Sequence, residues 1–126
     1  MIKSPIQTEE DLLLVKEFII LPLLLDVIQR DITIIKSVKL KFPNLFIECL
    51  NRIQDSIIRQ LFEVRAELKK RGIKVYSSER TKEYIQTSYR CRGYEHTITL
   101  MWELVRVAIE IRYGSLLIPA KEKEPS

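Results

Sequence analysis

The residues of this chain with the clearest potential for chemistry are the lysines and arginines between positions 69 and 92. Eight basic residues and two acidic ones, Glu79 and Glu83, fall in this stretch, so that it carries most of the positive charge of a chain whose formal net charge is +4. Positive charge gathered in one fifth of a sequence is typical of a surface that contacts anions. The phosphates of a nucleic acid are the first such partner to consider.

Tyrosines lie among these basic residues in a pattern that suits single-stranded nucleic acid. Lysine and arginine neutralise phosphates, and a tyrosine ring can stack on an unpaired base. We therefore expect a nucleic-acid contact on one face of a β-hairpin, with further basic residues as electrostatic support. The predicted contact residues are Lys74, Tyr76, Tyr84, Arg90 and Arg92, and the supporting residues are Lys69, Lys70, Arg71, Arg80 and Lys82. In the structural alternative, Tyr76 and Tyr84 pair across the hairpin and the charges keep an edge strand soluble.

Catalysis and metal binding have weaker support. Cys91 and His96, the single histidine, could form a nucleophile pair, but a break at Gly93 separates them and no third orienting group is evident. The two cysteines, Cys49 and Cys91, match no zinc spacing with that histidine. We therefore predict a non-enzymatic protein with no catalytic residue, no metal and no cofactor, and we expect two reduced, buried thiols.

The elements that must position these residues begin with a long helix predicted from Pro43 to Arg71. Its apolar residues recur every three or four positions and keep one stripe on a single face. Proline suits the first helical position, and Gly72 can adopt the left-handed conformation that ends a helix. The stripe consists of Phe46, Leu50, Ile53, Ile57, Leu61, Val64 and Leu68. A helix of this length would be about 43 Å long, which predicts an elongated molecule.

The region before the long helix is also predicted to be helical. Thr8, followed by three acidic residues, suits a helix start, and a second helical piece extends from Leu23 to about Val38. Pro22 between them either kinks one helix or separates two. The connection over residues 39–42 is short, which predicts that this region and the long helix are antiparallel neighbours.

After Gly72 the sequence changes to the alternation typical of β-strands. A hairpin is predicted at about 73–92, with its inward side chains against the helices: Ile73, Val75, Ile85, Tyr89 and Cys91. A last helix is predicted from Tyr94 or His96 to Tyr113, with two apolar stripes. The first contains Ile98, Met101, Val105 and Ile109, and the second contains Leu100, Leu104, Val107 and Ile111.

A helix that is apolar on two sides is either central in the core or central and part of an interface. Tryptophan and tyrosine beside such a stripe are frequent interface anchors. We therefore predict a homodimer with interface residues Trp102, Tyr113, Leu116 and Leu117. The alternative is a monomeric core in which Trp102 is satisfied.

Length and composition indicate a single globular domain. The chain has 126 residues, of which 46% are hydrophobic and 30% charged. We expect one domain over residues 1–118 and a disordered tail over residues 119–126. The most apolar run, residues 18–25, is too short to cross a bilayer, and the start of the chain does not look like a signal peptide. We therefore expect a cytoplasmic protein without a membrane partner.

Several short strings give the chain a resemblance to a known group of proteins. L-P-L-L-L and Q-R-D lie in the first helical region, R-G-I-K-V-Y at the turn into the first strand, and Y-R-C-R-G-Y-E-H before the last helix. Over residues 18–112 this order resembles a family of small uncharacterised helical proteins of Bacillus-type Firmicutes. The resemblance implies a cytoplasmic bacterial protein with no assigned activity.

Together these patterns predict a predominantly helical α+β fold, an elongated antiparallel bundle of three or four helices with one β-hairpin before the last helix. The expected function is that of a non-enzymatic binding or regulatory protein that contacts nucleic acid through the hairpin. The alternative is a helical protein-interaction module that binds a second copy of itself or an acidic partner.

Overall fold

The computed structural model describes residues 7–118, and the predicted disordered tail lies outside the described residues. The predicted α+β class is confirmed, but the predicted antiparallel bundle of three or four helices is wrong, because the described residues form three helices and a three-stranded sheet. The elements in chain order are α1 (Glu9–Ser37), α2 (Pro43–Lys70), β1 (Ile73–Arg80), β2 (Tyr84–Cys91), β3 (Tyr94–Met101) and α3 (Trp102–Leu117).

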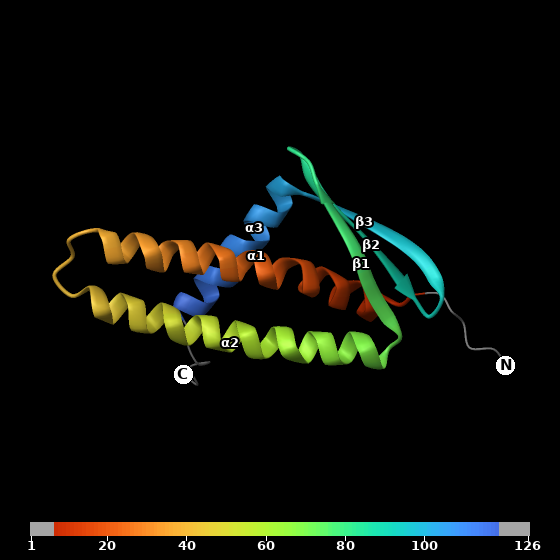
Figure 1. Ribbon diagram of the computed structural model, residues 1–126, viewed down its shortest axis with the longest axis horizontal. Helices are drawn as coiled ribbons and strands as arrows, with labels where there is room; N and C mark the ends of the chain where they lie inside the picture. The colour runs from red at the N-terminus through yellow and green to blue at the C-terminus, as the bar shows by residue number, and fades with distance from the viewer. Residues whose placement is uncertain (1–6, 119–126) are drawn as a thin grey trace, which may run out of the picture.

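α1 and α2 form a long antiparallel hairpin with the sheet at one end (Figure 1). α1 is a single helix with Pro22 in its interior, so the proline does not separate two helices. The helix begins in a capping box, in which the Thr8 hydroxyl accepts a hydrogen bond from the Asp11 N–H and the Asp11 carboxylate accepts one from the Thr8 N–H. α2 ends one residue before the predicted end, and Gly72 follows with a φ of 73°.

β1, β2 and β3 form an antiparallel sheet in that order. The predicted two-stranded hairpin is therefore wrong in its number of strands. The predicted last helix is wrong at its start, because residues 94–101 form β3 and α3 begins at Trp102. The connection between β2 and β3 is a tight turn, in which Arg92 and Gly93 both have positive φ.

Two apolar clusters hold these elements together. One lies between the inner face of the sheet and the helices, and the other lies between α1 and α2 along their length. The predicted inward residues of the strands are confirmed, because Ile73, Ile85, Tyr89 and Cys91 are buried and Val75 is half-buried. The alternation of the first two strands was therefore sufficient to assign their inner face.

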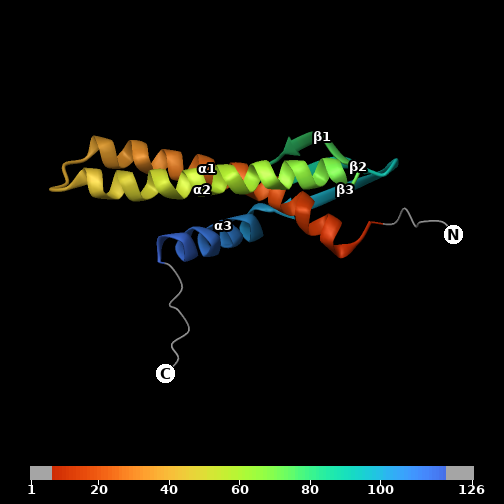
Figure 2. The same cartoon turned by 90° about the horizontal axis from the view of Figure 1, so that it is seen from below.

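α3 lies to one side of the layer that α1 and α2 form (Figure 2). Val105 is its one fully buried residue, and the other side chains of this helix are half-buried or exposed. α3 therefore contributes less to the core than α1 or α2 does. Within residues 7–118, no helix is both long and apolar enough to cross a membrane.

Candidate interaction surfaces

The outer face of the sheet carries part of the predicted nucleic-acid site. Lys74 of β1 is opposite Arg90 of β2, and Tyr76 lies nearby at an irregularity in the β1 register. Glu95 of β3, opposite Arg90, accepts hydrogen bonds from the Tyr76 hydroxyl and, at 2.8 Å, from the Arg90 guanidinium. The guanidinium also lies over the Tyr76 ring, 5.4 Å from its centroid. Two predicted contact residues are thus bound to one carboxylate, which the sequence analysis did not include in the site.

The Tyr76 hydroxyl and then the Arg90 guanidinium lower the pKa of Glu95 below its ordinary value. Glu95 also raises the pKa of the Tyr76 phenol, first because the hydrogen bond to the carboxylate holds the phenolic proton, and further because the carboxylate disfavours a second negative charge. The three side chains therefore form a self-contained charged group on the outer face, with the acid ionised at neutral pH.

The structural alternative, in which Tyr76 and Tyr84 pair across the hairpin, is wrong. In the observed register Tyr84 is opposite Met101 of β3, and Tyr76 lies near the other end of the hairpin. The register of β1 and β2 places Tyr76 beside Ser88 and Tyr89, whereas Tyr84 lies next to the turn and is paired with β3. The two aromatic rings therefore cannot act as adjacent stacking platforms.

The remaining basic residues of the predicted site are spread over the length of the sheet. Lys74 and Arg80 lie near opposite ends of β1, about 20 Å apart at the usual rise per strand residue. The Arg80 guanidinium lies 5.9 Å from the centroid of the Trp102 ring. Lys82 is exposed in the turn after β1, and Lys69 and Lys70 are exposed at the end of α2. These side chains do not form one compact basic patch.

Arg71 and Arg92 reach a buried carboxylate instead of the outer face. The side chain of Asp11 is 1% exposed and accepts hydrogen bonds from Arg71 Nη1 at 3.0 Å and from Arg92 Nη2 at 2.6 Å. Arg71 also pairs with Glu67 at 2.9 Å, and Arg92 donates to the Arg71 carbonyl oxygen. The prediction that Arg92 faces outward beside Arg90 is therefore wrong. We call Asp11, Glu67, Arg71 and Arg92 the Asp11 cluster.

Burial alone would raise the pKa of Asp11, but hydrogen bonds from Arg92, the Thr8 N–H and Arg71 hold it well below its ordinary value. The Cys91 thiol lies 3.9 Å from the same carboxylate, and burial raises the pKa of that thiol. A nucleophilic thiol requires the opposite shift. Asp11 is therefore an ionised structural centre, and its surroundings keep Cys91 protonated.

The other residues weighed for chemistry are also placed by the structure. His96 is opposite Tyr89 in the register, and the two rings stack with centroids 5.3 Å apart. Cys49 is half-buried, whereas the prediction had it fully buried. Among residues 7–118, no group of three or more histidine, cysteine, aspartate or glutamate side chains could hold a metal ion.

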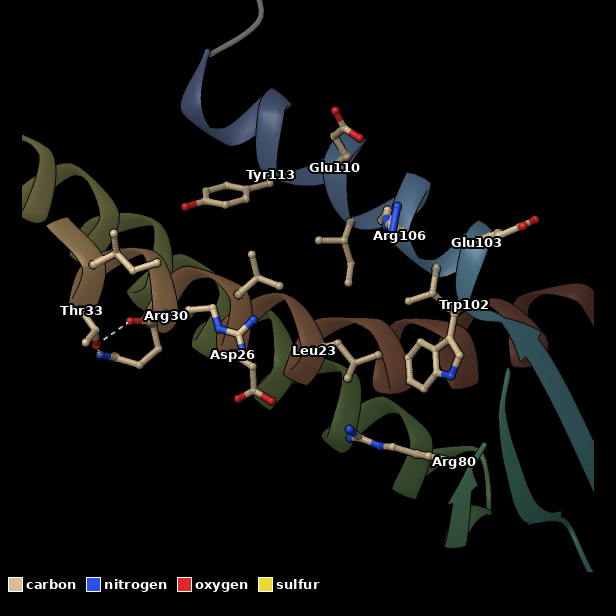
Figure 3. Close-up of a pocket in the computed structure, with 15 residues that line it drawn as sticks. Leu23, Asp26, Arg30, Thr33, Arg80, Trp102, Glu103, Arg106, Glu110 and Tyr113 are labelled. Atoms are coloured by element: carbon tan, nitrogen blue, oxygen red, sulfur yellow. Dashed lines mark hydrogen bonds between the residues drawn. The ribbon is translucent and has the colours of Figure 1, made fainter. Parts of the chain in front are cut away.

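A groove of about 1120 Å³ lies between α1 and α3. Figure 3 shows α1 along one side and α3 along the other, with Trp102 and Arg80 at one end and Tyr113 toward the opposite end. Apolar side chains from both helices line it, among them Leu23 and Ile109. Its lining also contains acidic and basic side chains in similar numbers, so the groove favours no single charge class of ligand.

The predicted interface residues are mostly engaged within the chain. The Trp102 indole N–H donates to the Thr81 carbonyl oxygen at 2.7 Å, and the Tyr113 hydroxyl donates to Asp31 at 2.7 Å. Leu116 packs against the cluster between α1 and α2. Leu117 is the exposed member of this set. Three of these four residues therefore hold α3 against the rest of the molecule and are not free to form an interface.

The second apolar stripe predicted for the last helix is the part of α3 that is exposed. The exposed fractions are 66% for Leu104, 51% for Val107 and 67% for Ile111. Their spacing of three and four places them on one side of the helix, away from buried Val105. We call Leu104, Val107 and Ile111 the α3 stripe. Leu100, which the sequence analysis also placed there, belongs to β3.

Comparison with known proteins identifies a family and nothing more specific. The family model described as YhjD protein matches residues 6–120. The match covers every helix and strand of the described structure. No curated protein and no solved structure matches the chain.

Proposed function

This chain belongs to the YhjD protein family, and we propose that it is a non-enzymatic protein that acts by binding other proteins through α3, with a second copy of itself as the first partner. The observation that carries this proposal is the exposure of the α3 stripe. Single apolar residues scattered over a protein surface are ordinary. Three large apolar side chains in a row on one helix form a contiguous patch, and such patches are typical of interaction sites.

The stripe suits a partner helix that runs in the opposite direction. In an antiparallel pair with a two-fold axis near Val107, Leu104 of one copy faces Ile111 of the other. The small side chain of Ala108 next to the axis would allow the two helices to approach closely. The same patch thus serves both copies, as a two-fold interface requires.

The charges beside the stripe are also self-complementary. Arg106 and Glu110 lie four residues apart on the flank of α3 between the α3 stripe and the groove, whose lining includes both. Both are exposed, and within the described residues neither has an ion pair. The two-fold axis near Val107 places Arg106 of each copy opposite Glu110 of the other. Opposite charges in these positions favour the antiparallel arrangement over a parallel one.

The expected dimer is dissociable. A helix of 16 residues is about 24 Å long, so that one face of it provides less than the roughly 800 Å² per partner of a standard stable interface. We therefore expect self-association with a micromolar dissociation constant. A partner protein with a larger interface could displace the second copy from α3. This range suits a regulatory protein that exchanges partners.

Nucleic-acid binding by the outer face of the sheet is the weaker proposal. Tyr76 and Arg90 are already bound to Glu95, and two further arginines belong to the Asp11 cluster. Binding would require the exposed lysines and Arg80 to hold the phosphates. We also propose a cytoplasmic location and an origin in Bacillus-type Firmicutes, which follow from composition and from the resemblance of the sequence strings.

The test is sedimentation equilibrium of the whole chain and two matched variants. Val107→Asp places a charge in the α3 stripe, whereas Ile58→Asp places one on α2 at nearly the same exposure, 53% against 51%. We expect the wild type and Ile58→Asp to dimerise at micromolar concentration and Val107→Asp to remain monomeric. Equal behaviour of the two variants would remove α3 as the contact surface.

A further inference from the structure

The turn between α1 and α2 lies at the end of the helical hairpin farthest from the sheet (Figure 1). Several large apolar side chains in and beside this turn are exposed. Phe42 is 64% exposed and Leu45 is 65% exposed, although both are large apolar residues. Four more large apolar residues in the same short segment are also exposed. We call this surface the hairpin tip, and its apolar members are Ile34, Val38, Leu40, Phe42, Leu45 and Phe46.

The charges of the hairpin tip have a single sign. Lys36, Lys39 and Lys41 lie among the apolar residues, and no acidic residue occurs between Asp31 and Glu48. The arrangement differs from the groove and from the outer face of the sheet, where charges of both signs are mixed. A partner for this tip must therefore offer both an apolar interior and negative charge.

The start of α2 has a favourable proline, Pro43, at its first position, but it has neither a polar N-cap nor an acidic first turn. Its first turn contains no acidic residue, and Phe42 at the N-cap position makes no side-chain hydrogen bond to the helix. An acid in the first turn and a serine or aspartate at the N-cap are the usual stabilising choices. Local helix stability does not explain why lysine and phenylalanine occupy this segment.

We propose that the hairpin tip binds the surface of an anionic lipid bilayer. Phenylalanine and leucine side chains enter the boundary between headgroups and acyl chains, and the lysines pair with lipid phosphates. A basic apolar tip at the end of a helical rod can reach this depth without any segment that spans the bilayer. The proposal replaces the expectation of no membrane partner, which was based on the lack of a spanning run alone.

The hairpin tip is separate from the α3 stripe, and each proposal can fail without the other. Self-association through α3 is measured in the absence of lipid, whereas binding by the tip is measured on vesicles. The tip lysines and the apolar residues Phe42 and Leu45 play no part in the predicted dimer.

The test is co-sedimentation of the whole chain with two kinds of vesicle, phosphatidylglycerol mixed with phosphatidylcholine, and phosphatidylcholine alone. We expect binding to the anionic vesicles only, with an affinity that falls as salt is raised. The double variant Phe42→Ser/Leu45→Ser should bind at least about tenfold more weakly, since it removes the two most exposed apolar side chains of the hairpin tip. Serine at position 42 is a favourable N-cap residue, so this variant retains the start of α2.

A second variant and a control separate the two contributions. Lys39→Glu/Lys41→Glu should also weaken binding about tenfold or more, because it reverses the charge that faces the lipid. Ile58→Ser/Phe62→Ser removes exposed apolar residues from α2 away from the tip and should bind like the wild type. Absence of binding to the anionic vesicles, or equal binding by all variants, would overturn the proposal. A change in oligomeric state of the tip variants without lipid would overturn it in favour of a protein contact.

Discussion

The Asp11 cluster and the hairpin tip lie in different regions of the molecule and use charge in opposite ways. In the Asp11 cluster, one buried carboxylate binds two arginines, and apolar residues such as Tyr89 and Cys91 nearby are fully buried. At the hairpin tip, three lysines lie among exposed apolar side chains, and within the described residues no carboxylate pairs with them. Basic residues therefore stabilise the fold in one region and remain available to a partner in the other.

This difference separates the residues that stabilise the fold from the residues that are available to bind a partner. The sheet is connected to both long helices through the Asp11 cluster, since Asp11 belongs to α1 and the two arginines follow α2 and β2. The side chains of the α3 stripe and the hairpin tip, by contrast, are exposed and do not join one element to another. Substitutions in the first region should change the free energy of unfolding, and substitutions in the other two should change binding.

The largest expected effect is that of Asp11→Asn. The variant keeps the size of the side chain but loses two charge-assisted hydrogen bonds from arginines that are themselves partly exposed. We expect a loss of about 2–3 kcal/mol in the free energy of unfolding, measured by urea denaturation at neutral pH. A loss below about 0.5 kcal/mol would mean that the cluster does not stabilise the sheet end.

The pH dependence of stability should follow from the same carboxylate. The pKa of Asp11 is lower in the folded protein than its unfolded value of about 3.9, so its contribution is complete above that pH and declines as the pH falls toward the folded value. The wild type should therefore lose stability below about pH 4 more steeply than Asp11→Asn. Parallel curves for the two proteins, from urea denaturation at several pH values, would contradict this assignment.

Glu95→Gln should have the smallest effect on stability, because its partners Arg90 and Tyr76 are exposed and salt screens their interaction. We expect a thermal unfolding midpoint close to that of the wild type. The same variant releases the arginine and the tyrosine from the carboxylate, so it also tests the nucleic-acid hypothesis. Fluorescence anisotropy with a single-stranded oligonucleotide at about 50 mM salt should reveal no gain in binding. A clear gain in binding would support the outer face of the sheet as a nucleic-acid site.

The starts of the two long helices could be predicted from the sequence because their signals are local. Thr8 and Pro43 mark the starts of α1 and α2, and the apolar period of α2 extends over nearly its whole length. Pro22 could not be assigned from sequence, since a proline either kinks or breaks a helix and the packing of its neighbours decides which. Leu21 and Leu24 on either side of it are fully buried in one continuous helix.

The third strand could not be predicted because two periods overlap in its sequence. Ile98 and Met101 have the spacing of a helix with Val105, whereas His96, Ile98 and Leu100 have the alternation of a strand. Pairing of β3 with β2 decides in favour of the strand, and that pairing is a long-range contact. Glu95 was missed as a partner of Arg90 for the same reason.

The Asp11 cluster also could not be predicted from local sequence patterns. Asp11 is 60 residues from Arg71 and 81 residues from Arg92 along the chain, and the pattern of Arg92 in a strand predicted an outward side chain. The turn at Arg92, with a φ of 49°, redirects that side chain toward Asp11. Basic residues that are clustered in sequence were therefore divided by the fold between a structural centre and the surface.

The measurement that tests the central claim most directly is a charge-reversal cycle on α3, followed by sedimentation equilibrium without lipid. Arg106→Glu and Glu110→Arg each place like charges opposite one another across the predicted two-fold axis, and each should weaken self-association by about tenfold or more. The double variant restores opposite charges and should dimerise nearly as well as the wild type. A double variant that is no better than the single ones, or a wild type that stays monomeric at hundreds of micromolar, would contradict the assignment of α3 as the contact surface.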